Sequence, residues 1–301
     1  DGWAIAEVKS SAGVKDYHLG DLATQAWVVA RSGTPVSSAC IRHIDSSFRL
    51  QREGDYAGLF RDAECLDLLA DLIADREAIV ARARAVLAGD EPDVSTGEHC
   101  ARPFACEFSS YCARHDPPDP DWPISLLPRT GRAIAARWAE EGLFDLNDLK
   151  PGVLANAVHE RVREATVTGE AYLDRQGAIE ATKGWAWPRA CLDFETIGPA
   201  APRWVGCRPF QQIPFQFSCH IEAEGGEIIH TGFLSIDGGD PRRACAEALV
   251  AQLGAERCGA IIAYNAAFER RCVRDLAEAF PDLAQALIEI PHFPLEDAIT
   301  P

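Results

Sequence analysis

The chain has 301 residues, of which 47% are hydrophobic and 25% are charged, and its formal net charge is −17. These fractions are those of an ordinary globular protein, and the length accommodates two domains. There is no run of about 18 apolar residues and no signal-peptide pattern, so we expect a cytoplasmic protein without a membrane span. The negative charge argues against a broad basic surface for nucleic acid but leaves room for local basic clusters.

Cysteine and methionine usage gives two further expectations. The 11 cysteines are an odd number and are scattered, unlike a secreted disulfide framework, so clustered cysteines favour metal binding. The sequence contains no methionine and opens directly in a predicted strand. We therefore expect it to be an internal piece of a longer protein.

The first predicted module covers residues 1–115. Alternating and helical apolar patterns predict strands over residues 3–11 and 38–44 and helices over residues 17–31 and 65–87, the last ended by Gly89.

Three polar residues of this module form a candidate site. The strand period places Glu7 and Lys9 on one face, and the following helix carries Gln25. A glutamate can hold a divalent metal, and a neighbouring lysine can stabilise developing charge or orient the attacking water. The alternative is an exposed ion pair on an edge strand, which contributes little to stability.

Three cysteines spaced by six residues, Cys100, Cys106 and Cys112, lie in a segment with little helical or strand pattern. Structural zinc and iron–sulfur clusters both need four ligands, so this triplet requires a fourth. The possible local donors are His99 and His115, with Cys40 and Cys65 as weaker choices. The alternative is three thiols without a ligand.

Residues 116–185 are predicted to be a helical linker. A segment rich in proline and aspartate, residues 116–123, marks the first domain boundary. Short helices follow, over residues 130–141 and 154–168, and none of these residues carries a recognisable chemistry.

The third predicted region, residues 186–301, contains the central candidate site. Asp193 and Glu195 follow an apolar segment that reads as a buried strand, so their carboxylates point to the same face. Two adjacent acids are costly unless a cation lies between them, and Mg²⁺ prefers such oxygen ligands. The alternative is a strand end whose acids meet solvent or an arginine.

The elements of this region have a recognisable order. We expect strands, a helix, a strand and a helix in the order βββαβα, over residues 191–196, 212–221, 227–235, 241–253, 260–264 and 265–280. With acids at the end of the first strand, this order resembles the ribonuclease-H-like fold. Asn265 and Glu269 resemble the second motif of DEDD (DnaQ-like) 3′–5′ exonucleases, which normally has aspartate where Glu269 stands.

Asn265 and Glu269 have a structural as well as a functional explanation, and the third exonuclease motif is not recognisable. Asn265 and Glu269 are four residues apart and so share a helical face, but Asn265 also suits a helix N-cap. His292 and Asp297 do not suit the third exonuclease motif, so we expect that motif, with its last ligand, beyond residue 301.

Other motifs carry a wider resemblance. Glu7-Val8-Lys9 with Gln25 resembles the core of RecB-like PD-(D/E)XK nucleases, and the cysteine triplet resembles that of their iron–sulfur members. Together with residues 192–196, 209–214 and 264–269, these motifs resemble the bacterial domain-of-unknown-function family 2779, in which a RecB-like module precedes a DnaQ-like one. The resemblance implies a 4Fe–4S cluster in preference to zinc, and an aspartate and a fourth cysteine upstream.

These observations predict a metal-dependent nuclease acting on DNA or RNA, of the 3′–5′ exonuclease type, without a membrane partner. Asp193, Glu195 and Glu269 are expected to hold Mg²⁺ or Mn²⁺, and Glu7, Lys9 and Gln25 to serve the first module. A different possibility stays open, a nucleic-acid-binding or scaffold protein with degraded nuclease folds. Both sites are expected to be incomplete within these 301 residues.

Overall fold

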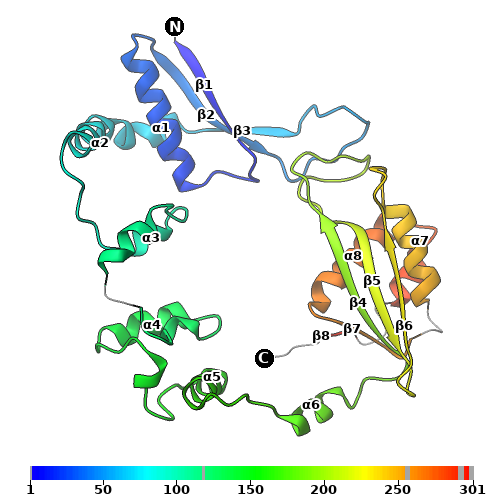
Figure 1. Cartoon of the computed structure of the whole chain (residues 1–301). Helices are drawn as coiled ribbons and strands as arrows, with labels where there is room; N and C mark the ends of the chain where they lie inside the picture. Colours follow the sequence, from blue (N-terminus) through cyan, green and yellow to red (C-terminus); the bar gives the residue numbers. More distant parts are fainter. Residues whose placement is uncertain (1, 117–118, 255–257, 291–294, 298–301) are drawn as a thin grey trace. The chain divides into compact units, whose positions relative to one another are not determined.

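The computed structural model describes residues 2–116, 119–254, 258–290 and 295–297 (Figure 1). By its internal contacts the chain divides into two compact units, Asp1–Glu91 with Trp185–Thr300, and Pro92–Gly184. The boundary expected at residues 116–123 lies inside the second unit. Two sheets and several helices make the chain a mixed α/β protein. Within the described ranges, no helix is both long enough and apolar enough to span a bilayer.

Three strands form the first sheet, in the order β1-β2-β3. β1 (Trp3–Lys9) pairs parallel with β2 (Val36–Ile44), which pairs antiparallel with β3 (Phe60–Glu64). Parallel neighbours need a crossover connection, and α1 (Asp16–Arg31) provides it. The two predicted strands and the predicted helix are confirmed, whereas the sequence pattern does not predict β3.

Glu7 and Lys9 lie on the face of this sheet that packs against α1. Ile5, Glu7 and Lys9 of β1 are half-buried while the residues between them are exposed, as the strand period predicts. Ile5 packs against a core that α1 shares with β2 and the turn after β3, made of Leu22, Ala23, Ala26, Ala39, Ile41, Cys65 and Leu69.

The helix predicted over residues 65–87 is split and only partly packed. It begins as a 3₁₀ turn, η1 (Leu66–Leu69), and continues as α2 (Ala70–Ala88), with Gly89 as its C-cap. Leu72 and Ile73 pack against the first core, but Leu87 is 86% exposed. The predicted apolar stripe is therefore used only at its N-terminal end.

The second sheet has five strands in the order β6-β5-β4-β7-β8, with β4 in the centre. The strands are β4 (Arg189–Ile197), β5 (Ile213–Glu222), β6 (Ile228–Leu234), β7 (Ala260–Ala263) and β8 (Leu295–Asp297). β4, β5 and β6 form an antiparallel meander, while β7 and β8 run parallel to β4. The predicted strands and their order along the chain are confirmed.

Two helices pack against this sheet, α7 (Arg242–Leu253) and α8 (Ala266–Ala279) (Figure 1), and α9 (Ala284–Glu289) packs on both of them. Leu192 and Phe194 of β4 are buried in one core with residues of all three helices. Phe217 of β5 meets the ring of Phe194 edge-on and stacks on Phe233, with ring centroids 6.0 and 6.2 Å away. Because side chains alternate along a strand, Asp193 and Glu195, which follow Leu192 and Phe194, face the other way.

The second unit is helical. Its α-helices are α3 (Ser109–Cys112), α4 (Gly131–Ala139), α5 (Ala157–Thr168) and α6 (Arg175–Thr182). Its 3₁₀ turns are η2 (Glu98–Ala101), η3 (Ala113–His115), η4 (Ile124–Leu126) and η5 (Leu146–Asp148). A small core holds this unit together, formed by Ile124, Leu127, Leu146, Leu149 and Leu154. The helices predicted over residues 130–141 and 154–168 are confirmed with shorter bounds.

Candidate functional sites

Asp193 and Glu195 lie on the central strand of the five-stranded sheet, and both are exposed. They alternate with the buried residues Leu192 and Phe194, so the two carboxylates share the face of β4 that points away from the helices. In the β4–β5 register, Asp193 is opposite Ser218. The expected pairing of these two acids on one strand face is confirmed.

A cavity of about 450 Å³ adjoins the first of these acids. Asp193, Cys191, His220 and Tyr264 are among the residues that line it, and Tyr264 is 71% exposed. The cavity therefore combines a carboxylate with an accessible aromatic ring that sequence patterns alone do not place beside Asp193.

Glu269 occupies a different environment. It is only 2% exposed and lies on the stripe of α8 that also carries the core residues Ala266 and Val273, three residues before and four residues after it. Among the residues that the structure describes, no group of three or more His, Cys, Asp or Glu side chains could hold a metal ion. Asp193 and Glu195 are therefore brought together, and Glu269 does not join them.

Asn265 is the N-cap of α8. Its side-chain oxygen accepts a hydrogen bond from the backbone N–H of Phe268, at 3.3 Å. Of the two residues that do not suit the third motif, His292 lies outside the described residues. Asp297 is on β8, in register with Ala263 of β7.

The three candidate residues of the first module do come together. Lys9 Nζ lies 2.8 Å from Glu7 Oε1, and Gln25 Nε2 donates to Glu7 Oε2 at 2.7 Å. The side chains of Glu7 and Lys9 are about one-fifth exposed. Hydrogen bonds from Lys9 and then Gln25 hold the pKa of the Glu7 carboxyl below its ordinary value of 4.5.

The structure adds two side chains of α1 to this group, and the sequence patterns miss the first of them. Asp21 Oδ2 accepts from Lys9 Nζ at 2.5 Å, which raises the pKa of Lys9 and lowers that of Asp21. His18 is buried on the same helix, and burial followed by the positive charge of Lys9 lowers its pKa. The spacing of His18, Asp21 and Gln25, by three and four residues, is the signal that places them on one helical face.

The three cysteines of the triplet lie in the second unit. Cys100 and Cys112 are half-buried and Cys106 is exposed, and the backbone N–H of Cys106 donates to the carbonyl of Cys100 at 2.7 Å. Their thiols are not gathered into a ligand set within the described part of the chain. Both weaker choices for a fourth ligand, Cys40 and Cys65, lie in the first unit.

β4 and its sheet define an α/β domain whose central strand presents two neighbouring carboxylates. Residues 190–293 match the family described as a domain of unknown function (DUF2779). The match includes Asp193, Glu195 and Glu269 but neither the first module nor the cysteine triplet. No curated protein and no solved structure gave a match.

Proposed function

We propose that the protein is a divalent-metal-dependent nuclease that hydrolyses phosphodiester bonds of DNA or RNA, of the 3′–5′ exonuclease type. The observation that carries this proposal is the exposed pair Asp193 and Glu195 on the central strand of a β6-β5-β4-β7-β8 sheet. This strand order, with an antiparallel meander followed by parallel strands, resembles a ribonuclease-H-like (DnaQ-like) domain. The sequence motifs predict a domain of this kind.

The residues at β4 suit a hard cation. Asp193 and Glu195 offer carboxylate oxygens on one exposed face, and Mg²⁺ or Mn²⁺ prefers such ligands. When bound, the ions would activate water and neutralise the charge that develops on the leaving oxygen. Tyr264 lies in the same cavity as Asp193 and offers a ring on which a base can stack. Because Glu269 is buried, the proposal rests on the pair alone.

A second centre of the same class is proposed in the first module, which resembles a RecB-like PD-(D/E)XK nuclease. Lys9 is held between Glu7 and Asp21, so its ammonium is fixed beside a carboxylate that could hold a metal. Gln25 orients that carboxylate through its hydrogen bond. We propose a structural role for the cysteine triplet, as ligands of a 4Fe–4S cluster or of zinc together with a fourth ligand.

A second candidate function is supported by specific observations. The burial of Glu269 and the net charge of −17 favour a nucleic-acid-binding or scaffold protein in which the nuclease sites have degenerated. This alternative predicts binding without cleavage.

The two functions are separated by a cleavage assay on end-labelled single-stranded DNA and RNA in Mn²⁺. Wild type should degrade at least one strand from an end, and Asp193→Asn should be slower by more than about 100-fold, the upper effect of losing an outer-shell partner of a metal. Glu224→Gln, at an exposed acid in the β5–β6 turn of the same domain, is the matched control and should keep wild-type activity. A wild type that cleaves neither strand supports the scaffold alternative.

A further inference from the structure

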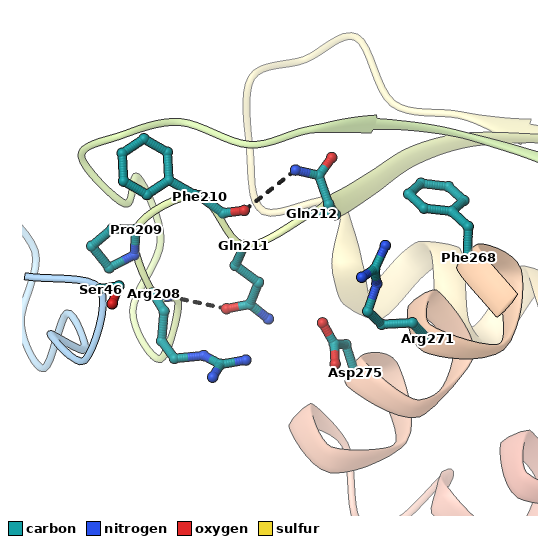
Figure 2. Close-up of a pocket in the computed structure, with 9 residues that line it drawn as sticks. All are labelled: Ser46, Arg208, Pro209, Phe210, Gln211, Gln212, Phe268, Arg271 and Asp275. Carbon is teal, nitrogen blue, oxygen red and sulfur yellow. Dashed lines mark hydrogen bonds between the residues drawn. The ribbon is translucent and has the colours of Figure 1, made fainter. Parts of the chain in front are cut away.

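A second cavity lies at the carboxyl end of β4, between the β4–β5 connection and α8 (Figure 2). It measures about 530 Å³, and the residues that line it include Arg208, Gln211, Gln212, Phe268, Arg271 and Asp275. None of these residues has a role in the site at Asp193. The β4–β5 connection includes residues of the sequence motif 209–214.

The loop that forms one wall is held in a defined shape. Thr196, which directly follows Glu195, donates from its hydroxyl to Gln212 Oε1 at 2.8 Å, and Gln212 Nε2 donates to the Phe210 carbonyl at 3.3 Å (Figure 2). The backbone of Phe210 has a φ of 59°, which is unusual for a bulky residue. Such strain persists where the surroundings enforce it, and it clusters at functional sites.

The β4–β5 connection also forms hydrogen bonds with the β2–β3 connection of the first sheet. Leu50 and residues 206–207 exchange two backbone hydrogen bonds, from Leu50 N–H to the Cys207 carbonyl at 3.0 Å and from Gly206 N–H to the Leu50 carbonyl at 2.8 Å. Both segments belong to the first compact unit. Hydrogen bonds from Thr196 of β4 and from Leu50 of the β2–β3 connection therefore hold the loop that forms this wall of the cavity.

Two arginines bring positive charge to the cavity. Arg208 and Arg271 are exposed, and within the described ranges neither guanidinium forms an ion pair. Other arginines of this unit are paired, for example Arg242 with Asp240 and Arg243 with Asp282. Asp275 is the carboxylate that lines the cavity, and burial raises its pKa, although the charges of Arg208 and Arg271 oppose that shift.

The two cavities are linked by the segment that leads from β7 into α8. Tyr264 lines the cavity at Asp193, and Phe268, four residues later, lines the cavity at Arg271. The Arg271 guanidinium lies 5.5 Å from the centre of the Phe268 ring. Aromatic rings beside cations are what single-stranded nucleic acid needs, because every base can stack on a ring while phosphates meet the charges.

We propose that this cavity binds a phosphate of a single-stranded nucleic acid whose end reaches Asp193 and Glu195. Arg208 and Arg271 contact the phosphate, since a guanidinium fork matches its oxygens, and Phe268 stacks with the adjacent base. The inference rests on the proposed function, because it supplies the polymer-binding subsite of that same centre. It also gives a chain of net charge −17 a local basic contact for an anionic strand.

The test measures binding without cleavage. The full chain is titrated against a fluorescent single-stranded oligothymidylate in EDTA over a range of salt concentrations. Arg208→Ala/Arg271→Ala is compared with Arg203→Ala/Arg274→Ala, which removes one exposed arginine from the same loop and one from the same helix, neither lining the cavity. Thermal unfolding of each variant verifies that it is folded, and Arg208→Lys/Arg271→Lys retains the charge without the fork.

We expect the cavity double variant to bind at least about tenfold more weakly, the effect of one hydrogen bond to a charged group. Its log affinity should depend less steeply on log salt, with a slope smaller by about 0.7 for the one phosphate of a single strand that is no longer neutralised. The control double variant should keep both values, and the lysine variant should restore most of the slope. Equal losses in the two alanine pairs, or no binding by wild type, would overturn the inference.

Failure of the inference and failure of the proposed function give different results. Binding that depends on Arg208 and Arg271, with no cleavage in Mn²⁺, supports the subsite and contradicts the nuclease. Cleavage that requires Asp193, with binding unaffected by the two arginines, supports the nuclease and contradicts the subsite.

Discussion

Lys9 is the residue on which the charge arrangement of the first site depends. Its ammonium lies between the carboxylates of Glu7 and Asp21, with Gln25 completing the set from α1. Glu7, Lys9 and Gln25 are recognisable in the sequence because their spacing follows a strand and a helix. Asp21 is not, because its contact with Lys9 exists only when α1 packs over β1.

This network gives a pH-dependent prediction. Because the folded state lowers the pKa of Glu7 below 4.5, its contribution to stability is present above that value and is lost as the pH falls through the folded pKa. Glu7→Gln should therefore reduce the free energy of unfolding at pH 7, by up to about 1 kcal/mol for a partly exposed pair. At acid pH the difference from wild type should disappear.

Denaturant unfolding at neutral and acid pH checks this. Glu53→Gln, at an exposed acid of the β2–β3 connection, is the control and should show no pH-dependent difference from wild type. A Glu7→Gln deficit that is the same at both pH values would contradict the assignment.

Helix α8 shows why the orientation of an element is harder to predict than its existence. The sequence predicts a helix from residue 265 with Asn265 and Glu269 on one face, and the helix is there. Asn265 is exposed at the cap, whereas Glu269 is buried on the stripe of α8 that also carries Ala266 and Val273. Which stripe of α8 meets the sheet depends on contacts with β4 and α7, distant in sequence, so the burial of Glu269 could not be predicted from spacing.

Strand β3 illustrates the same limit. Phe60–Glu64 is short and mostly polar, so it lacks a strand pattern. Its backbone pairs antiparallel with β2, and two side-chain contacts accompany this pairing: Arg42 Nε lies 2.7 Å from Asp62 Oδ1, and Ser38 Oγ donates to Glu64 Oε2 at 2.8 Å. Both partners lie more than 15 residues away.

We expect the N-cap residue of α8, Asn265, to contribute to the stability of the fold. Asn265→Ala removes the acceptor for the Phe268 N–H and should lower the free energy of unfolding by about 1 kcal/mol. Asn265→Asp keeps an acceptor and should retain most of the stability. Denaturant unfolding of the two variants distinguishes them, and equal losses would mean that the cap bond contributes nothing.

In the whole molecule, the two compact units do not coincide with the modules predicted from the sequence motifs. The first module and the third region contribute to one compact unit, and the cysteine triplet lies in the other. The sequence motifs follow one another in order, but they do not indicate which segments pack together.

The proposed cluster is tested by the composition of the purified protein. Protein prepared without oxygen should contain iron and sulfide, and both should be lost in Cys100→Ser/Cys106→Ser/Cys112→Ser. Cys191→Ser, at an exposed cysteine of β4, should retain them. Stoichiometric zinc without iron would replace the cluster by a zinc site, and neither metal would contradict any metal role for the triplet.

The central claim is that Asp193 and Glu195 together hold a divalent cation. Calorimetric titration with Mn²⁺ tests it directly, by comparing wild type with Asp193→Asn/Glu195→Gln and with the control Glu224→Gln/Glu227→Gln, which removes two exposed acids of the β5–β6 turn. We predict that wild type and the control bind the same number of ions and that the site variant loses at least one. Identical titrations for all three proteins would contradict the claim.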